Sequence, residues 1–224
     1  MIRVIDDFIH PSYYNAIENN VLQNFVWKWS SSISGGNVSI DNADSSRLFG
    51  FSHLIFDAGK SSSQFYEFLL PFFIQAQSET DAKDFLRARG DMTVISGEQV
   101  TYQPHIDMPS HKDHINMIFY IGDSDGDTII YKEKYSLPKK NFYPFLESEP
   151  KMNFYTGPQV KTKLVHSTEL VPKTLTVEQQ VTPKANRLVI FNGEHWHTGQ
   201  SPKNHSRRVI LNLNFAPNDY RVNK

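Results

Sequence analysis

The stretch Tyr102-Gln103-Pro104-His105-Ile106-Asp107 is the part of the chain from which fold and chemistry are best predicted. His105 and Asp107 are two residues apart, so on a continuous strand both side chains point to the same face. A second imidazole, His197, lies much later, shortly after the apolar run Arg187-Leu188-Val189-Ile190-Phe191. The sequence therefore predicts that strands far apart in the chain bring two imidazoles and one carboxylate together.

Two histidines and one carboxylate on one face of an iron ion leave three coordination positions open, as in non-haem Fe(II) oxygenases. Two of these positions can take a 2-oxo acid as a chelate, and the third can take dioxygen. A zinc hydrolase needs only one open position. We therefore predict that His105, Asp107 and His197 are the metal ligands and the catalytic centre.

A 2-oxo acid with a second carboxylate also needs a cation at its far end, and arginine binds carboxylates bidentately. Arg207 and Arg208 follow His197 at the start of the last predicted strand, and both are candidates. Arg208 shares one face with Ile210 and Asn212, whereas Arg207 belongs to the alternate, otherwise apolar face. The alternation favours Arg208 as the residue that faces the metal.

At this point the chain resembles a known family, the 2-oxoglutarate and Fe(II)-dependent dioxygenases, and within it the prolyl 4-hydroxylase-like branch with its short phage and marine bacterial members. The resemblance covers nearly the whole chain except residues 133–180. The matching stretches are Val4-Ile5-Asp6-Asp7-Phe8, Tyr102–Pro109, Ile118-Phe119-Tyr120-Ile121, the turn Asp125-Gly126-Asp127-Thr128, Pro183–Phe191, His197, Pro202 and Arg207-Arg208.

The resemblance implies a mainly β fold, with a double-stranded β-helix (jelly-roll) core and N-terminal helices packed on one sheet. It implies that Fe(II) is bound by His105, Asp107 and His197, with 2-oxoglutarate and O2 as cosubstrates and ascorbate as a candidate accessory reductant. Arg208 or Arg207 matches the residue that binds the distal carboxylate of 2-oxoglutarate. Tyr102 matches a tyrosine near the cosubstrate, and Tyr120 or Phe119 lies on a strand that often supplies a hydroxyl to it.

The local patterns predict helices first and strands afterwards, which favours a β-sandwich or open barrel with helices outside one sheet. Helices are expected from Pro11 and from about Ser62, where Pro71 either bends the helix or restarts it. Strands are expected at residues 92–96, 98–105, 115–121, 127–132, 187–192 and 206–215. Trp27 and Trp29 are interpreted as core residues. Residues 30–46 are expected to be a loop.

The length of 224 residues is typical of one domain, here residues 1–224, and residues 133–180 are interpreted as an insertion between two core strands. A net charge of −1 gives no indication of nucleic acid as a partner. The chain has no cysteine, no long apolar run and no basic N-terminal region. We therefore expect a cytoplasmic protein without a membrane partner, and the resemblance adds the option that it is phage-encoded.

Several acidic and histidine residues compete with the predicted ligands. His111-Lys112-Asp113 is a second His-x-Asp pair, but it leaves almost no loop before the strand at residue 115. His195 could share a face with His197, yet only His197 is followed by Thr-Gly-x-x-Pro as in the resembled family. Asp123, Asp125 and Asp127 lack the glutamate of a calcium loop, so a solvated turn is expected.

The sequence thus predicts an Fe(II)- and 2-oxoglutarate-dependent hydroxylase of a peptidyl, prolyl-like or small-molecule C–H bond. The alternative is a catalytically silent jelly-roll module that binds a metal or another ligand. The substrate and the oligomeric state cannot be read from these residues, because specificity is expected to reside in residues 30–46 and 133–180.

Overall fold

The computed structural model describes residues 2–31, 33, 49–109, 111, 113–135 and 171–217. The helices in this part of the chain are α1 (Pro11–Asn24) and α2 (Tyr66–Ser78). The strands are β1 (Arg3–Ile5), β2 (Lys28–Ser30), β3 (Gly50–Asp57), β4 (Lys60–Ser61), β5 (Asp84–Val94), β6 (Ile115–Tyr120), β7 (Thr128–Lys134), β8 (Val177–Val181), β9 (Leu188–Asn192), β10 (His195–Gly199) and β11 (Arg207–Ala216).

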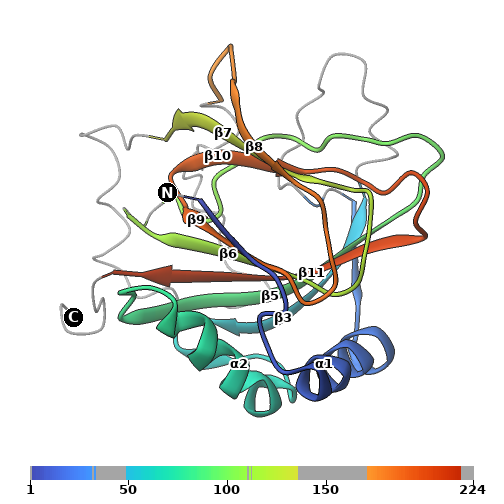
Figure 1. The fold of residues 1–224 in the computed structure, drawn as a ribbon, viewed down its shortest axis with the longest axis vertical. Coiled ribbons are helices and arrows are strands. Elements are labelled where there is room, and N and C mark those ends of the chain that lie inside the picture. The colour runs from blue at the N-terminus through green and yellow to red at the C-terminus, as the bar shows by residue number, and fades with distance from the viewer. Residues whose placement is uncertain are drawn as a thin grey trace, which may run out of the picture.

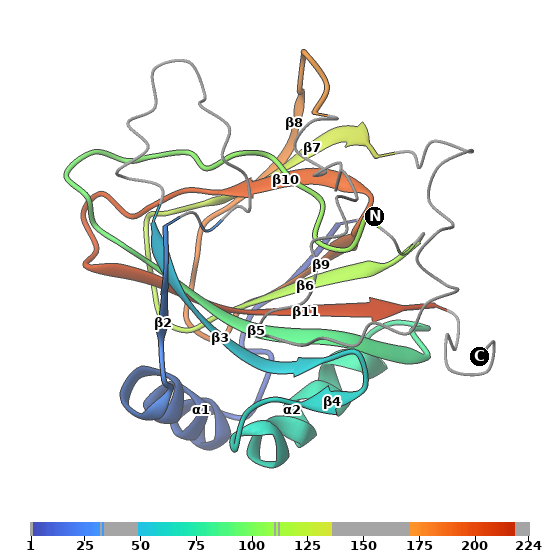
Figure 2. The same ribbon diagram turned by 180° about the vertical axis from the view of Figure 1, so that it is seen from behind.

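Two antiparallel sheets lie across from one another, and both helices cover the outer face of the larger sheet (Figures 1 and 2). The larger sheet has eight strands in the order β1-β9-β6-β11-β5-β3-β2, with β4 paired to β3. The smaller sheet has the order β10-β7-β8. The predicted mainly β jelly-roll with N-terminal helices on one sheet is confirmed.

Strand β11 lies between β5 and β6. Its side chains alternate between the core beside the helices and the space between the two sheets. Val209, Leu211 and Leu213 are buried in the core between the larger sheet and the helices. Arg208 and Asn212 point to the opposite side, into the space between the sheets. Because successive side chains of a strand alternate, one strand supplies both the apolar core and the polar lumen.

The helices pack on the sheet through aromatic and aliphatic side chains. Helix α1 begins at Pro11, where a proline loses no intrahelical hydrogen bond, and the Nδ1 atom of His10 accepts a hydrogen bond from the Ser12 backbone N–H at 3.3 Å. Its buried residues are Tyr14, Ile17 and Val21. Helix α2 begins at Tyr66 and continues through Pro71 as one helix, without a restart.

Some local predictions differ from the structure. Strand β5 begins at Asp84 rather than at residue 92, because its apolar and polar residues alternate over a longer span than the predicted strand at 92–96. The predicted strand at 98–105 is instead an irregular segment with two isolated bridges, Thr101 to Gln200 and His105 to His197. Strands β2, β3, β4, β8 and β10 were not predicted. Strand β8 begins inside the segment interpreted as an insertion and ends one residue beyond it.

Trp29 is 64% exposed on the edge strand β2, so its predicted role in the core is wrong, whereas Trp27 packs against the helix-side core. Most of the predicted loop at 30–46 and most of the segment 133–180 lie outside the described residues. Neither described helix has the length and apolarity needed to cross a membrane.

Phe119 on β6 is a suitable test of the helix-side core. It is fully buried, and its ring centroid lies 4.7 Å from that of Phe72 and 6.2 Å from that of Tyr14. Phe119→Ala is expected to lower the free energy of unfolding by about 3–5 kcal/mol, because it removes this packing and leaves a cavity. Trp29→Ala is the exposed control and should change it by less than about 0.5 kcal/mol. Urea denaturation followed by circular dichroism measures both, and equal losses would contradict this view of the core.

Candidate metal centre and cosubstrate pocket

The structure brings His105, Asp107 and His197 together, with one potential ligand atom of each within 4.8 Å of the others. The irregular segment before His105 runs antiparallel to β10, and His105 and His197 exchange backbone hydrogen bonds of 2.9 and 3.2 Å. Their ring centroids are 4.6 Å apart. A backbone bridge between two irregularly paired segments, rather than a continuous strand, therefore places the two imidazoles side by side.

Hydrogen bonds to the backbone orient both imidazoles for metal binding. Nδ1 of His105 lies 3.0 Å from the Gln103 carbonyl oxygen, and Nδ1 of His197 lies 3.0 Å from the His195 carbonyl oxygen. Because a carbonyl oxygen can only accept, each Nδ1 carries a proton and donates it to that oxygen, which leaves Nε2 as the nitrogen that faces the cluster. Nε2 of His197 lies 3.3 Å from Oδ2 of Asp107, and Nε2 of His105 lies 3.9 Å from Oδ1.

Asp107 is held by side chains from three strands of the larger sheet, and its own side chain is only 3% exposed. Oδ1 accepts a hydrogen bond of 2.9 Å from Nη2 of Arg87 on β5. Oδ2 accepts bonds of 2.9 Å from Asn116 on β6 and 3.0 Å from Asn212 on β11. Asn214 ties this group together, because it accepts from Arg87 and donates to Asn116.

The protonation states suit metal binding. Burial, together with the neighbouring His197, lowers the pKa of His105 to about 4, so its imidazole is neutral at pH 7. Burial alone raises the pKa of the Asp107 carboxyl, but His197 and the Arg87 guanidinium outweigh it and hold that pKa well below its usual range. The cluster therefore presents a neutral imidazole and an ionised carboxylate without prior loss of a proton.

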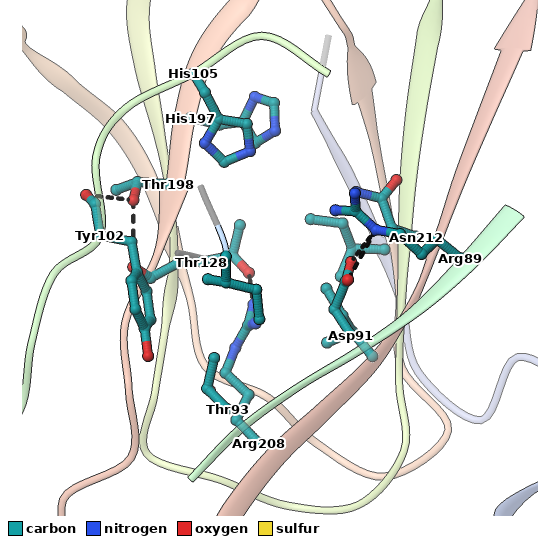
Figure 3. Close-up of a pocket in the computed structure, with 14 residues that line it drawn as sticks. Arg89, Asp91, Thr93, Tyr102, His105, Thr128, His197, Thr198, Arg208 and Asn212 are labelled. Atoms are coloured by element: carbon teal, nitrogen blue, oxygen red, sulfur yellow. Dashed lines mark hydrogen bonds and ion pairs between the residues drawn. The ribbon is translucent and has the colours of Figure 1, made fainter. Parts of the chain in front are cut away.

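A pocket between the two sheets extends from the histidines to Arg208 (Figure 3). Arg208 is 6% exposed, and its Nη2 donates a 2.7 Å hydrogen bond to Oγ1 of Thr128. The hydroxyl of Tyr120 donates to the same oxygen at 2.7 Å. The pocket is lined by Ile33, Arg89, Asp91, Thr93, Tyr102, His105, Ile118, Thr128, His197, Thr198, Gly199, Arg208, Ile210 and Asn212.

Gly126, in the turn before β7, allows this arrangement by its small size. A Cβ atom there would overlap the carbonyl oxygen of Gln200 and would approach Cδ of Arg208 to 3.0 Å. The glycine of the Asp125-Gly126-Asp127-Thr128 turn is therefore required by the close approach of the chain after β10. This packing keeps Thr128 next to Arg208.

The other predicted site residues have distinct positions. Arg207 is exposed on the outer face of β11, so of the two arginines only Arg208 reaches the pocket. Tyr102 forms part of the pocket wall. Tyr120 is fully buried behind Thr128, and its ring centroid lies 5.7 Å from Cζ of Arg208. Phe119 belongs to the helix-side core and faces away from the pocket.

The competing residues lie elsewhere. Within the described ranges, His105, Asp107 and His197 are the one group of three potential metal ligands, and His111 and Asp113 are not in it. Nδ1 of His195 lies 2.7 Å from the carbonyl oxygen of Tyr131, and His195 does not line the pocket. The carboxylate of Asp125 accepts hydrogen bonds from the backbone N–H groups of Lys203 and Asn204, so it ties two loops together.

Four polar residues that share one face of β5 were not predicted as site residues, namely Arg87, Arg89, Asp91 and Thr93. Their signal was a period-two alternation that starts well before residue 92, where the predicted strand began. Thr128 and Asn116 were also not predicted as neighbours of the site. Their roles depend on pairing between distant strands, which no local pattern reports.

The fold and the site together define a jelly-roll protein with a cluster of two histidines and one carboxylate beside a pocket with an arginine in its wall. The family model described as the 2OG-Fe(II) oxygenase superfamily matches residues 91–216, more than half of the 224-residue chain. The chain therefore belongs to the 2OG-Fe(II) oxygenase superfamily, which implies Fe(II), 2-oxoglutarate and O2. No curated protein matches the chain significantly.

Solved structures share the fold at low sequence identity. A 2OG-Fe(II) oxygenase family oxidoreductase from Burkholderia pseudomallei is similar with a TM-score of 0.59 and 10% identity, over 97% of this chain and 86% of that one. A prolyl hydroxylase from Trichoplax adhaerens, in complex with a hypoxia inducible factor peptide fragment, has a TM-score of 0.55 and 14% identity. The match covers 96% of this chain and 83% of that one. A Pseudomonas putida prolyl-4-hydroxylase has a TM-score of 0.52 and 10% identity, over 96% of this chain and 91% of that one.

The side chains present fit the cofactors that the superfamily implies. Two imidazole nitrogens and one carboxylate oxygen are a ligand set suited to Fe(II) with open positions. The buried polar atoms of pocket residues without a hydrogen-bond partner among the described residues include Nε of Arg208 and Oδ1 of Asn212. Because such atoms are costly to leave unpaired, the pocket is suited to a polar ligand.

The buried histidines predict a pH dependence for the metal-free protein. Burial lowers the pKa of both His105 and His114 to about 4, whereas an unfolded chain has a histidine pKa of about 6.5. Between these values the unfolded chain binds protons that the folded chain does not, so stability is complete above about pH 6.5 and is lost as the pH falls. The expected loss by pH 5 is about 2 kcal/mol per histidine.

Urea denaturation in the presence of a chelator from pH 7 to pH 4 measures this loss. His114→Gln should flatten the profile, whereas His10→Asn, at the exposed start of α1, should not change it. A wild-type profile that is level between pH 7 and pH 5 would contradict the assignment.

Proposed function

We propose that this chain is an Fe(II)- and 2-oxoglutarate-dependent hydroxylase of the prolyl 4-hydroxylase-like branch, of the short type found in phages and marine bacteria. Its target would be a C–H bond of a peptidyl, prolyl-like residue or of a small molecule. The observation that carries the proposal is one continuous pocket with His105 and His197 at one end and the buried Arg208 in its wall. Two prolyl hydroxylases among the similar structures support the fold but not the substrate.

Bound Fe(II) would supply the activation of dioxygen, coupled to the conversion of 2-oxoglutarate to succinate and carbon dioxide. The overall reaction balances, because one oxygen atom of O2 enters succinate and the other becomes the hydroxyl of the substrate. The protein's own residues hold the metal ligands in place, bind the cosubstrate and shape the pocket.

The hydrogen bonds of Asp107 select the oxygen that would bind the metal. Oδ2 already accepts from Asn116 and Asn212, and a carboxylate oxygen has about two lone-pair sites. Oδ1 accepts from Arg87 alone and keeps one site. Asp107 would hold the metal together with His105 and His197, and Oδ1 is the carboxylate oxygen that keeps a lone-pair site for it.

Arg208 would bind the distal carboxylate of 2-oxoglutarate. Its Nε has no hydrogen-bond partner among the residues that the structure describes, and its Nη2 is oriented by Thr128. The hydroxyl oxygen of Thr128 accepts hydrogen bonds from both Arg208 and Tyr120, so its own proton points elsewhere and can be donated to a carboxylate. The roles of Tyr120, behind Thr128, and of Tyr102, in the pocket wall, would be to fix this end of the pocket.

Turnover and metal dependence test the proposal directly. Purified protein with Fe(II), 2-oxoglutarate and air is expected to form succinate, and a chelator should abolish the reaction. His105→Ala and His197→Ala should reduce turnover at least about 100-fold, because the remaining ligands bind the metal weakly. Absence of both succinate formation and 2-oxoglutarate binding would instead support the catalytically silent binding module.

The two neighbouring arginines offer a matched comparison. Arg208→Leu is expected to weaken 2-oxoglutarate binding roughly 10- to 150-fold, the cost of losing a charge-assisted hydrogen bond. Arg207→Leu changes an exposed side chain on the same strand and should leave affinity within about threefold. Isothermal titration of the Co(II)-loaded protein measures both constants. A larger effect at Arg207 would contradict the assignment of Arg208.

A further inference from the structure

Arg89 and Asp91 are two charged residues of the pocket that the proposed function does not use. They lie two residues apart on β5, so both side chains point into the space between the sheets. Nε of Arg89 donates a 3.0 Å hydrogen bond to Oδ2 of Asp91 and lies 2.7 Å from Oδ1 (Figure 3). The ion pair fixes the direction of the guanidinium on a strand paired on both sides.

The terminal nitrogens of Arg89 remain available to a ligand. Among the described residues, the only hydrogen bond of its guanidinium is the one that Nε donates to Asp91. The Arg89 side chain is 27% exposed, and the Asp91 side chain is 9% exposed. The four N–H groups of these terminal nitrogens face the pocket, and a guanidinium is suited to an anion that enters it.

Arg89 lies near the metal cluster and apart from Arg208. Figure 3 shows its guanidinium on the wall opposite Tyr102, beside Asn212, which donates a hydrogen bond to Asp107. Arg89 on β5 is also paired in register with Asn212 on β11. The pocket thus has two guanidinium groups, one next to Thr128 and one close to the metal ligands.

We propose that Arg89, oriented by Asp91, binds a second carboxylate in this pocket, separate from the carboxylate assigned to Arg208. The inference rests on the proposed function, since it places that carboxylate next to the reacting centre. The planar fork of an arginine matches a carboxylate with two parallel hydrogen bonds, and a fork already fixed by Asp91 loses little freedom on binding. The carboxylate belongs either to a small acidic primary substrate or to the C1 end of 2-oxoglutarate.

The test uses Arg89→Met, which keeps an unbranched side chain without the charge, in the Co(II)-loaded full-length chain. Arg89→Lys, which keeps the charge beside Asp91 but loses the fork, is measured in parallel. Arg207→Met is the matched control, because it removes an exposed arginine on the adjacent strand. Isothermal titration gives the affinity for 2-oxoglutarate. At saturating 2-oxoglutarate, paramagnetic relaxation of the methyl protons by Co(II) then compares acetate with its neutral analogue acetamide.

If the carboxylate belongs to the primary substrate, the wild type should bind acetate more tightly than acetamide. Arg89→Met should reduce this affinity ratio at least about tenfold, while its affinity for 2-oxoglutarate stays within about threefold of the wild type. If it is the C1 carboxylate, Arg89→Met should weaken 2-oxoglutarate binding at least about tenfold instead. In either case Arg89→Lys should fall between the wild type and Arg89→Met.

The proposal would be overturned if Arg89→Met bound both 2-oxoglutarate and acetate as the wild type does. It would also be overturned if Arg207→Met lost as much affinity for them as Arg89→Met. Failure of the proposed function gives a different result. In that case Arg208→Leu would leave 2-oxoglutarate binding unchanged or the wild type would not bind it. The comparison of acetate with acetamide, repeated without 2-oxoglutarate, would still report on Arg89.

Discussion

A buried carboxylate must be paired, and the pairing of Asp107 is the constraint on which the rest of the site depends. An ionised side chain that is 3% exposed can remain in the interior only if several donors converge on it. Arg87, Asn116 and Asn212 are these donors, and they come from three neighbouring strands. The register of β5, β11 and β6 therefore sets the position of a residue that lies on none of them.

The same register also divides the pocket into two chemically different ends. At one end, Thr128 accepts hydrogen bonds from Arg208 and Tyr120 behind a wall that contains Tyr102. At the other, the ion pair of Arg89 and Asp91 lies on β5, the strand that also carries Arg87. Because Thr128, Arg208, Tyr120, Arg89 and Asp91 are mounted on paired strands and not on loops, their directions are fixed before any ligand binds.

The local sequence was most informative where a regular pattern coincided with a regular element. The alternation of the last strand predicted correctly that Arg208 lies on the side of the pocket. The alternate, apolar face packs against the helices through Val209 and Leu211. The start of α1 at Pro11 was also predicted, because proline is well suited to a first helical position. Trp29 was misassigned, since hydrophobicity alone does not distinguish a core strand from an edge strand that leaves one face uncovered.

The sequence by itself determined the ligand types, the arginine and the two faces of the last strand, because these follow from side-chain chemistry and from the period of a strand. Only the tertiary structure decided how they meet. His105 lies beside His197 through a bridge between an irregular segment and β10, not through the continuous strand that was expected. The hydrogen bonds that hold Asp107 and the position of Arg89 beside Asn212 arise from strand pairing, and pairing between distant segments depends on the whole packed sheet.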